Sequence, residues 1–160
     1  MQHELDIRSA HSDEAVLISN LILSVAHYFS SSPDGSVAEW FLDSVTPSEI
    51  EDYINDPKYN CLVAYSGQSL VGVVAVRDAT HIHHLFVAPD AHRQGIATCL
   101  WNRAKTIALR AGNNEGFFVR SSEYAVPVYE RFGFLIAGER SEKDGLVFVP
   151  MRLKLQHARG

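Results

Sequence analysis

The sequence has few cysteines, no long apolar run and no excess of basic residues, and each shortage excludes a class of protein. Its 160 residues hold two cysteines, Cys61 and Cys99, without C-x-x-C spacing, so neither a disulfide framework nor a cysteine zinc site is expected. Both cysteines lie in apolar runs, which predicts buried, unreactive thiols. Lysine and arginine total 14 against 19 acidic residues, a net charge of −5, and no basic stripe indicates a nucleic-acid partner.

Membrane insertion and export are not expected either. The apolar stretches are a few residues long, whereas about 20 are needed to cross a bilayer. Residues 1–6 contain no basic region followed by an apolar core, so no signal peptide is predicted. We therefore expect a cytoplasmic protein without membrane partners. Hydrophobic residues make up 46% and charged residues 21%, which favours one globular domain over residues 1–160.

The periodicity of the apolar residues predicts an α/β fold with a single mixed, mostly antiparallel sheet flanked by helices. A helix capped by Ser12 or Asp13 follows the first strand, and Thr46-Pro47 marks the start of another. A polar turn around residues 143–145 joins the last two strands. Strands are expected at 5–8, 61–65, 70–76, 80–87, 117–119, 134–137 and 146–155, and helices after residue 12 and at 37–42, 48–54, 96–111 and 126–131.

The segment from Leu85 to Thr98 carries the clearest chemistry. A strand stops at a proline, a polar loop follows, and Gly95 opens a helix whose first N–H groups have no internal partners. Gly95 has no Cβ, so a phosphate can approach the backbone, and Arg93 adds a charged donor. This arrangement suits a pyrophosphate, although a tight strand-to-helix turn alone would explain it. The patterns of nucleoside triphosphate and dinucleotide loops are absent.

The same segment resembles motif A of the GCN5-related N-acetyltransferases (GNAT), a pattern close to Val-x-Pro-x-x-Arg/Gln-x-x-Gly-x-Gly/Ala. His92 departs from it, because arginine or glutamine is usual there. The stretch Ala125-Val-Pro-Val-Tyr-Glu-Arg-Phe-Gly-Phe134 resembles motif B of the same family. Both motifs occur in the family's order, and the expected order of helices and strands fits the family's fold. The motif A matches are Val87, Pro89, Gly95 and Ala97.

The resemblance implies that acetyl-CoA is the co-substrate and lies between the fourth and fifth strands. By position, the backbone of residues 85–87 would pair with the pantetheine amides, and that of residues 93–98 would hold the pyrophosphate. Tyr129 matches the tyrosine that protonates the departing thiolate; its alternative is a half-buried packing role. Ser122 stands where an asparagine usually contacts the cofactor. The implied cofactor-binding residues are Leu85, Phe86, Val87, Arg93, Gln94, Gly95, Ile96, Ala97, Thr98 and Ser122.

Three histidines precede the cofactor loop on the strand of residues 80–87. Strand alternation places His81 and His83 on one face and His84 on the other with Ile82 and Phe86, unless a bulge intervenes. Two histidines on one face without a carboxylate do not form a metal site, so none is expected. His83 or His84 is a candidate base for the acceptor amine, with water or Glu123 in reserve. The alternative is that these rings only line the sheet.

Together these features predict an N-acetyltransferase that moves an acetyl group from acetyl-CoA to a primary amine of a small molecule or peptide by direct attack. The alternative is a non-catalytic acyl-CoA-binding or interaction module on the same fold. A homodimer stays an open option. Residues 30–59 contain seven acidic residues and one lysine, which indicates either a cationic acceptor or an ordinary solvated surface. The acidic residues are Asp34, Glu39, Asp43, Glu49, Glu51, Asp52 and Asp56.

Overall fold

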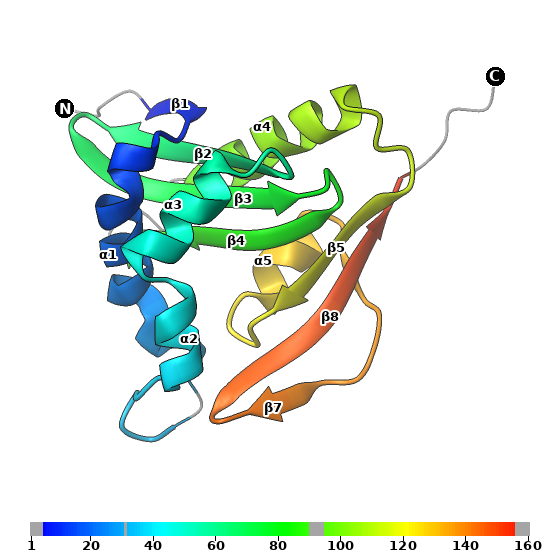
Figure 1. Ribbon diagram of the computed structural model, residues 1–160. Helices are drawn as coiled ribbons and strands as arrows, with labels where there is room; N and C mark the ends of the chain where they lie inside the picture. The colour runs from blue at the N-terminus through cyan, green and yellow to red at the C-terminus, as the bar shows by residue number, and fades with distance from the viewer. Residues whose placement is uncertain (1–4, 31, 90–94, 156–160) are drawn as a thin grey trace.

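The computed structural model describes residues 5–30, 32–89 and 95–155, and its centre is a mixed sheet in the order β1-β2-β3-β4-β5-β8-β6, with β7 paired to β8 (Figure 1). Among the pairings of the described residues, β4–β5 is parallel and the others are antiparallel, which confirms the predicted fold class. The strands are β1 (Leu5–Ser9), β2 (Tyr59–Ser66), β3 (Ser69–Arg77), β4 (His81–Val87), β5 (Gly116–Ser121), β6 (Leu135–Ile136), β7 (Ser141–Lys143) and β8 (Leu146–Lys154).

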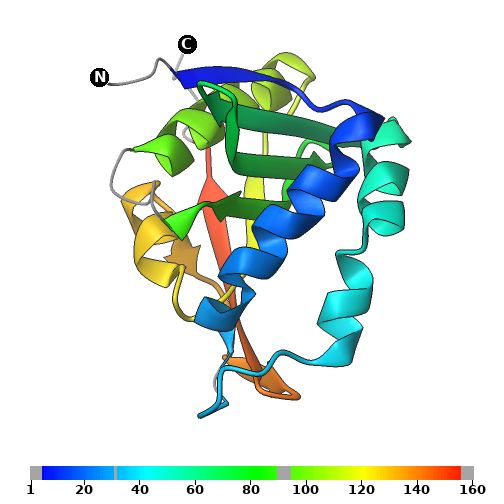
Figure 2. The ribbon, with the colours of Figure 1, turned by 90° about the vertical axis from the view of Figure 1, so that its left-hand side faces the viewer.

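Helices cover both faces of the sheet (Figures 1 and 2). The short η1 (Ser12–Glu14), α1 (Ala15–Val25), η2 (Ala26–Phe29), α2 (Glu39–Ser44) and α3 (Pro47–Asn55) lie on one side. On the other side, α4 (Ile96–Arg110) packs behind β2 to β4 and α5 (Val126–Arg131) lies beside β5. Apolar side chains fill the space between each layer and the sheet, for example Ile18 with Val63 on one side and Leu100 with Val74 on the other.

Local sequence signals explain most helix ends, but one predicted cap is wrong. Thr46 caps α3 and accepts a hydrogen bond from the Glu49 amide at 3.3 Å, as predicted. Ser12 and Asp13 do not cap α1, because they belong to η1. The N-cap of η1 is His11, whose amide donates to the Glu14 carboxylate at 2.8 Å, and the N-cap of α1 is Glu14. Glu14 thus occupies the glutamate position of a capping box at the start of η1.

Two further expectations are wrong. Cys61 is buried on β2, but Cys99 is exposed on α4, because it lies on the solvent side of a helix whose apolar stripe passes through Leu100. The segment before the last strand is more than a turn, since β7 pairs with β8 around Asp144. The polar residues of β7 are exposed, so its sequence gave no apolar alternation to detect.

Glu14 ties β1 and β2 to the start of α1 through a partly buried ion pair, in which the Glu14 side chain is buried and that of Arg8 is 40% exposed. Arg8 donates to both of its carboxylate oxygens, at 3.0 and 2.8 Å, and the Tyr65 hydroxyl donates as well. Burial by itself raises the pKa of Glu14, but the hydrogen bonds from Arg8, Tyr65 and the His11 amide outweigh it and lower that pKa to about 2. The charged form therefore stabilises the folded protein.

We expect Glu14→Gln to lower the free energy of unfolding at pH 7 by about 2–3 kcal/mol, the equivalent of a pKa held about two units below its ordinary value. A lowered pKa stabilises the fold above the unfolded-state value of about 4.5, and this contribution is lost as the pH falls toward 2. Urea unfolding at pH 7 and near pH 2 should show the two proteins converging in acid. Glu51→Gln, on the exposed side of α3, is the control.

The parallel pair β4–β5 is short, and this creates an opening in the sheet. The two strands pair at His81–Phe118 and Ile82–Val119, after which they diverge (Figure 1). The end of β4 from His84 to Val87 therefore stays paired to β3 while its other edge faces the space beside α5.

Candidate active site

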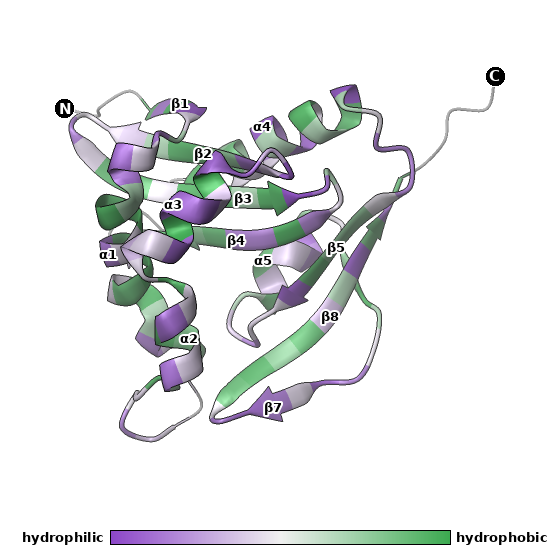
Figure 3. Ribbon diagram, viewed as in Figure 1, coloured by the Kyte–Doolittle hydropathy of each residue, from purple (hydrophilic) through white to green (hydrophobic). Residues whose placement is uncertain are grey.

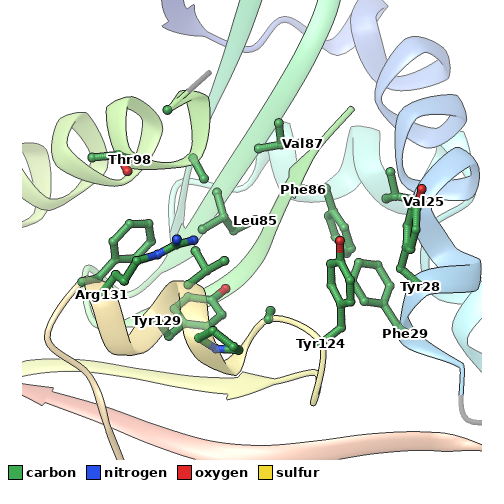
Figure 4. A pocket seen from close by; sticks show the side chains of 16 residues that line it. Val25, Tyr28, Phe29, Leu85, Phe86, Val87, Thr98, Tyr124, Tyr129 and Arg131 are labelled. Atoms are coloured by element: carbon green, nitrogen blue, oxygen red, sulfur yellow. The ribbon is translucent and has the colours of Figure 1, made fainter. Parts of the chain in front are cut away.

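A cavity of about 710 Å³ lies in this opening between β4 and β5 (Figure 4). Of the predicted cofactor-binding residues, six line it, Ile96 is buried in the core under α4, and Ser122 is not among the lining residues. Arg93 and Gln94 lie outside the described residues. The lining residues are Val25, Tyr28 and Phe29 from α1–η2; Leu85, Phe86 and Val87 from β4; Gly95, Ala97 and Thr98 at the start of α4; and Tyr124, Ala125, Pro127, Val128, Tyr129, Arg131 and Phe132 around α5.

At one end of the cavity, Gly95 begins α4 in a left-handed conformation with φ of 71°. A Cβ built on Gly95 would meet no atom within 4 Å, so open space lies in front of its backbone. The amides of the first helical turn point toward this end of the helix, where the macrodipole is positive. The geometry fits an anion that approaches the backbone closely, which is what a pyrophosphate requires.

The edge of β4 offers backbone groups along the length of the cavity. The Ala88 amide donates to the Val71 carbonyl on β3 at 2.8 Å. Amides alternate between the two edges of a strand, so those of Leu85 and Val87 point away from β3, toward the opening. An extended ligand with amide groups can therefore lie beside β4 as an added strand.

Tyr129 lies in the wall of the cavity opposite β4, with its hydroxyl directed inward (Figure 4). Only 5% of the residue is exposed, and its ring packs against Phe134 at a centroid distance of 5.5 Å. Burial raises the pKa of Tyr129 well above its ordinary value, because the charged phenolate would be poorly solvated. The hydroxyl is therefore protonated at neutral pH and is a hydrogen-bond donor.

The cavity also contains residues that the sequence did not single out. The Arg131 side chain extends into it from α5 on the same side as Thr98 (Figure 4). At the other end, Tyr28 of η2 stacks on Tyr124 with the ring centroids 5.2 Å apart, and the ring of Phe29 meets that of Phe86 edge-on with the centroids 5.4 Å apart. These aromatic residues come from distant parts of the chain, so no local pattern could have grouped them. They form an aromatic wall at the end of the cavity away from α4.

Ser122 and Glu123 have local roles in the structure. The Ser122 hydroxyl accepts a hydrogen bond from the Ala125 amide at 3.1 Å, which shapes the turn before α5. The Glu123 carboxylate is exposed and lies 3.4 Å from Arg140. Neither side chain lines the cavity.

The histidines of β4 do not follow simple alternation. Ala75 of β3 pairs with His84, and the next residue, Val76, pairs with Ile82, so His83 is an extra residue in the ladder. The bulge places His83 and His84 on the same face, with ring centroids 4.2 Å apart, while Ile82 packs on the opposite face. The expectation that His84 shares a face with Ile82 is therefore wrong, and the bulge is the reason.

His84 is held in place by Tyr53 of α3, another residue that sequence reasoning missed. The His84 Nδ1 atom lies 3.2 Å from the Tyr53 hydroxyl, and its ring lies 5.2 Å from that of Phe86 in the cavity wall. Burial lowers the pKa of His84 well below its usual value. Desolvation and the positive charge of neighbouring His81 and Arg77 lower the pKa of His83 to about 4. Both rings are thus neutral at pH 7.

The part of the chain that the structure describes contains neither a metal-binding cluster nor a membrane-spanning helix. Within residues 5–30, 32–89 and 95–155, no three histidine, cysteine, aspartate or glutamate side chains are close enough together to hold a metal ion. None of the helices described is long and apolar enough to cross a bilayer.

The family described as Acetyltransferase (GNAT) domain matches residues 8–155 of the chain. The peptidyl-lysine N-acetyltransferase YjaB of Salmonella typhimurium is 32% identical over 110 residues, which are 66% of this chain and 72% of that protein. The fold is thus that of an acetyltransferase. The chain belongs to the GNAT family and is an acetyl-CoA-dependent N-acetyltransferase.

Solved structures show the same fold. A GCN5-related N-acetyltransferase from Rhodopseudomonas palustris superposes with a TM-score of 0.77 at 18% identity, over 97% of this chain and 98% of that one. The PaiA N-acetyltransferase from Thermoplasma acidophilum, in complex with coenzyme A, gives 0.76 at 14% identity over 95% and 99%. A spermidine N-acetyltransferase from Vibrio cholerae, in complex with CoA and spermine, gives 0.66 at 19% identity over 94% and 95%.

Proposed function

We propose that residues 1–160 form one N-acetyltransferase domain that transfers the acetyl group of acetyl-CoA directly to a primary amine. The observation that carries this proposal is the cavity itself. It joins an anion-binding helix start at Gly95, a strand edge at Leu85–Val87 and the buried donor Tyr129 in one continuous space. A diphosphate, a chain of amides and a thioester follow one another in acetyl-CoA in that order.

Each group of the cavity has one task in the proposed reaction. Acetyl-CoA supplies the activated acetyl group as a thioester. A backbone amide near Val87 polarises the carbonyl oxygen, on which negative charge develops when the neutral amine attacks. As the carbon–sulfur bond breaks, the Tyr129 hydroxyl donates a hydrogen bond to the leaving sulfur. The neutral amine loses one proton and the departing thiolate gains one from solvent, so transfer to a neutral amine releases no net proton.

We assign the task of accepting the amine proton to the two histidines of the bulge. His84 lies behind Phe86, and Phe86 is the residue of the two that lines the cavity. His83 adjoins His84 and is exposed to solvent. An unprotonated imidazole near the cavity can accept a proton, and an exposed neighbour gives that proton a way to solvent.

The proposed function is tested by measuring thiol release from acetyl-CoA with a panel of primary amines, and by identifying the acetylated products by mass spectrometry. Primary amines should be acetylated with one thiol released per product. A protein that binds acetyl-CoA but acetylates none of the amines would be the non-catalytic binding module instead.

For the histidines, we expect His84→Gln to lower kcat/KM for the amine by about 10²-fold while acetyl-CoA affinity stays unchanged. Because the pKa of His83 is about 4 and that of His84 is also depressed, kcat/KM of the parent should show no break near pH 6.5 beyond the steady fall that protonation of the acceptor amine causes. His83→Gln and the double variant complete the series, and His81→Gln is the control. Full activity in all three variants would assign the proton to water.

A further inference from the structure

One face of the sheet carries a row of basic side chains. The register across four neighbouring strands aligns Arg77 of β3, His81 of β4, Phe118 of β5 and Arg152 of β8. Paired residues share a face, so these side chains lie together on it. Arg120 on β5 and Lys154 on β8 share the face, since each lies two residues from a member of the row. We call Arg77, Arg120, Arg152 and Lys154 the cationic face.

Of the described helices, α2 reaches this face of β8 at Phe148, whose ring centroid lies 6.0 Å from that of Trp40, and no described helix lies over the rest of β5 and β8 there (Figure 1). Hydrophilic residues occupy parts of these strands (Figure 3). Arg120, Arg152 and Lys154 are exposed, and 42% of the Arg77 side chain is accessible. The guanidinium of Arg120 lies over the Phe148 ring, 4.6 Å from its centroid, which holds it against the sheet.

The cationic face has little negative charge to balance it. Strands β4, β5 and β8 contain neither aspartate nor glutamate. The Asp78 carboxylate lies 3.7 Å from the Arg77 guanidinium. Burial and the positive charges of Arg77 and Arg120 lower the pKa of His81, and Asp78 opposes them. In a chain of net charge −5, this concentration of positive charge is a local feature.

The acidic residues between positions 30 and 59 do not offset it at the cavity. Glu39, Glu49, Glu51 and Asp52 are exposed on α2 and α3, whereas α3 turns Ile50 and Tyr53 toward the sheet. None of the seven acidic residues lines the cavity. The four acidic residues on α2 and α3 are therefore exposed at the outer surface and away from the cavity lining.

Residues of β4 connect the cationic face with the aromatic wall of the cavity, the end away from α4 where we expect the acceptor. Phe86 lies in the cavity wall, its ring is 5.2 Å from that of His84, and the His84 ring is 4.2 Å from that of His83. His81 follows on the same strand, beside Arg77. Phe86 and His81 are five positions apart on β4, which in an extended strand is a distance of about 16 Å.

We propose that the cationic face binds carboxylates of the amine acceptor, and that this acceptor is an acidic peptide. The proposal rests on the proposed acetyl transfer and names its substrate class. A distance of about 16 Å equals four or five extended residues, more than a small amine can span. Arg152 and Lys154 are two residues apart on one strand, a spacing that matches alternate side chains of an extended peptide.

The test uses blocked peptides with one internal lysine, identical except that residues about four positions away on both sides are glutamate, glutamine or arginine, so that each peptide has one acceptor amine. We expect kcat/KM for the glutamate peptide to exceed that of the glutamine peptide about tenfold, as two exposed ion pairs would give, and to fall toward it at high salt. Arg120→Gln/Arg152→Gln should reduce this ratio to near one. Arg103→Gln/Arg110→Gln, an equal charge change on α4, should retain it.

The other outcomes separate the two proposals. Equal rates for all three peptides, or a preference for the arginine peptide or for spermidine, would overturn the acidic-peptide acceptor and leave acetyl transfer intact. A small amine bearing one carboxylate that reacts as well as the glutamate peptide would refute the peptide acceptor. Absence of transfer to these acceptors and to a small neutral amine would refute the proposed function itself.

Discussion

Acetyl-CoA should no longer bind measurably when Gly95 is replaced by glutamate. The Cβ of the new side chain enters the open space in front of the helix start, where nothing lies within 4 Å, and its carboxylate meets the pyrophosphate there. Juxtaposed like charges cost several kcal/mol, so we expect a loss of affinity of more than about 100-fold. Isothermal titration calorimetry of the folded variant measures it.

A second glycine on the same helix provides the control for backbone strain. Gly95 has φ of 71° and Gly112, beyond the other end of α4, has φ of 104°, and a Cβ at Gly112 also meets no atom within 4 Å. Gly112→Glu therefore adds the same charge and a comparable strain far from the cavity. It should keep its affinity for acetyl-CoA. Equal affinity in both variants and the parent would show that the pyrophosphate lies elsewhere.

Removing the Tyr129 hydroxyl should slow the chemical step and leave cofactor binding intact. Thiols are more acidic than phenols by about 1.5 units, and burial raises the pKa of Tyr129 further. Full transfer of its proton is therefore unfavourable, and its contribution is a hydrogen bond to sulfur as charge develops. We expect Tyr129→Phe to lower kcat by about 10²-fold with little change in the Kd of acetyl-CoA.

The matched control is Tyr124→Phe, which removes a hydroxyl from another tyrosine of the same cavity. Tyr124 is 51% exposed and its ring stacks on that of Tyr28, so we expect its contribution to come from the ring and not from the hydroxyl. Single-turnover kinetics separate the chemical step from product release in both variants. If Tyr129→Phe and Tyr124→Phe behave alike at that step, Tyr129 has only a packing role.

Local sequence patterns determined most of the secondary structure. Thr46 and Pro47 specify the start of α3, and the apolar stripe through Ile96, Leu100 and Ala104 specifies the buried side of α4. These signals depend on neighbouring residues, so they are visible in the chain itself. The exposure of Cys99 was missed because an apolar run on a helix has two sides, and only packing against the sheet selects one of them.

The candidate site divides in the same way. The loop that ends at Gly95 and the segment around Tyr129 are continuous motifs, and the sequence by itself determined the family and singled out the residues at the Gly95 end of the cavity. The tertiary structure decided which residues lie at the other end. A bulge turned His84 toward Tyr53, and strand register aligned Arg77 with Arg152 across four strands. Bulges and register arise from pairing between distant segments, so a one-dimensional pattern does not contain them.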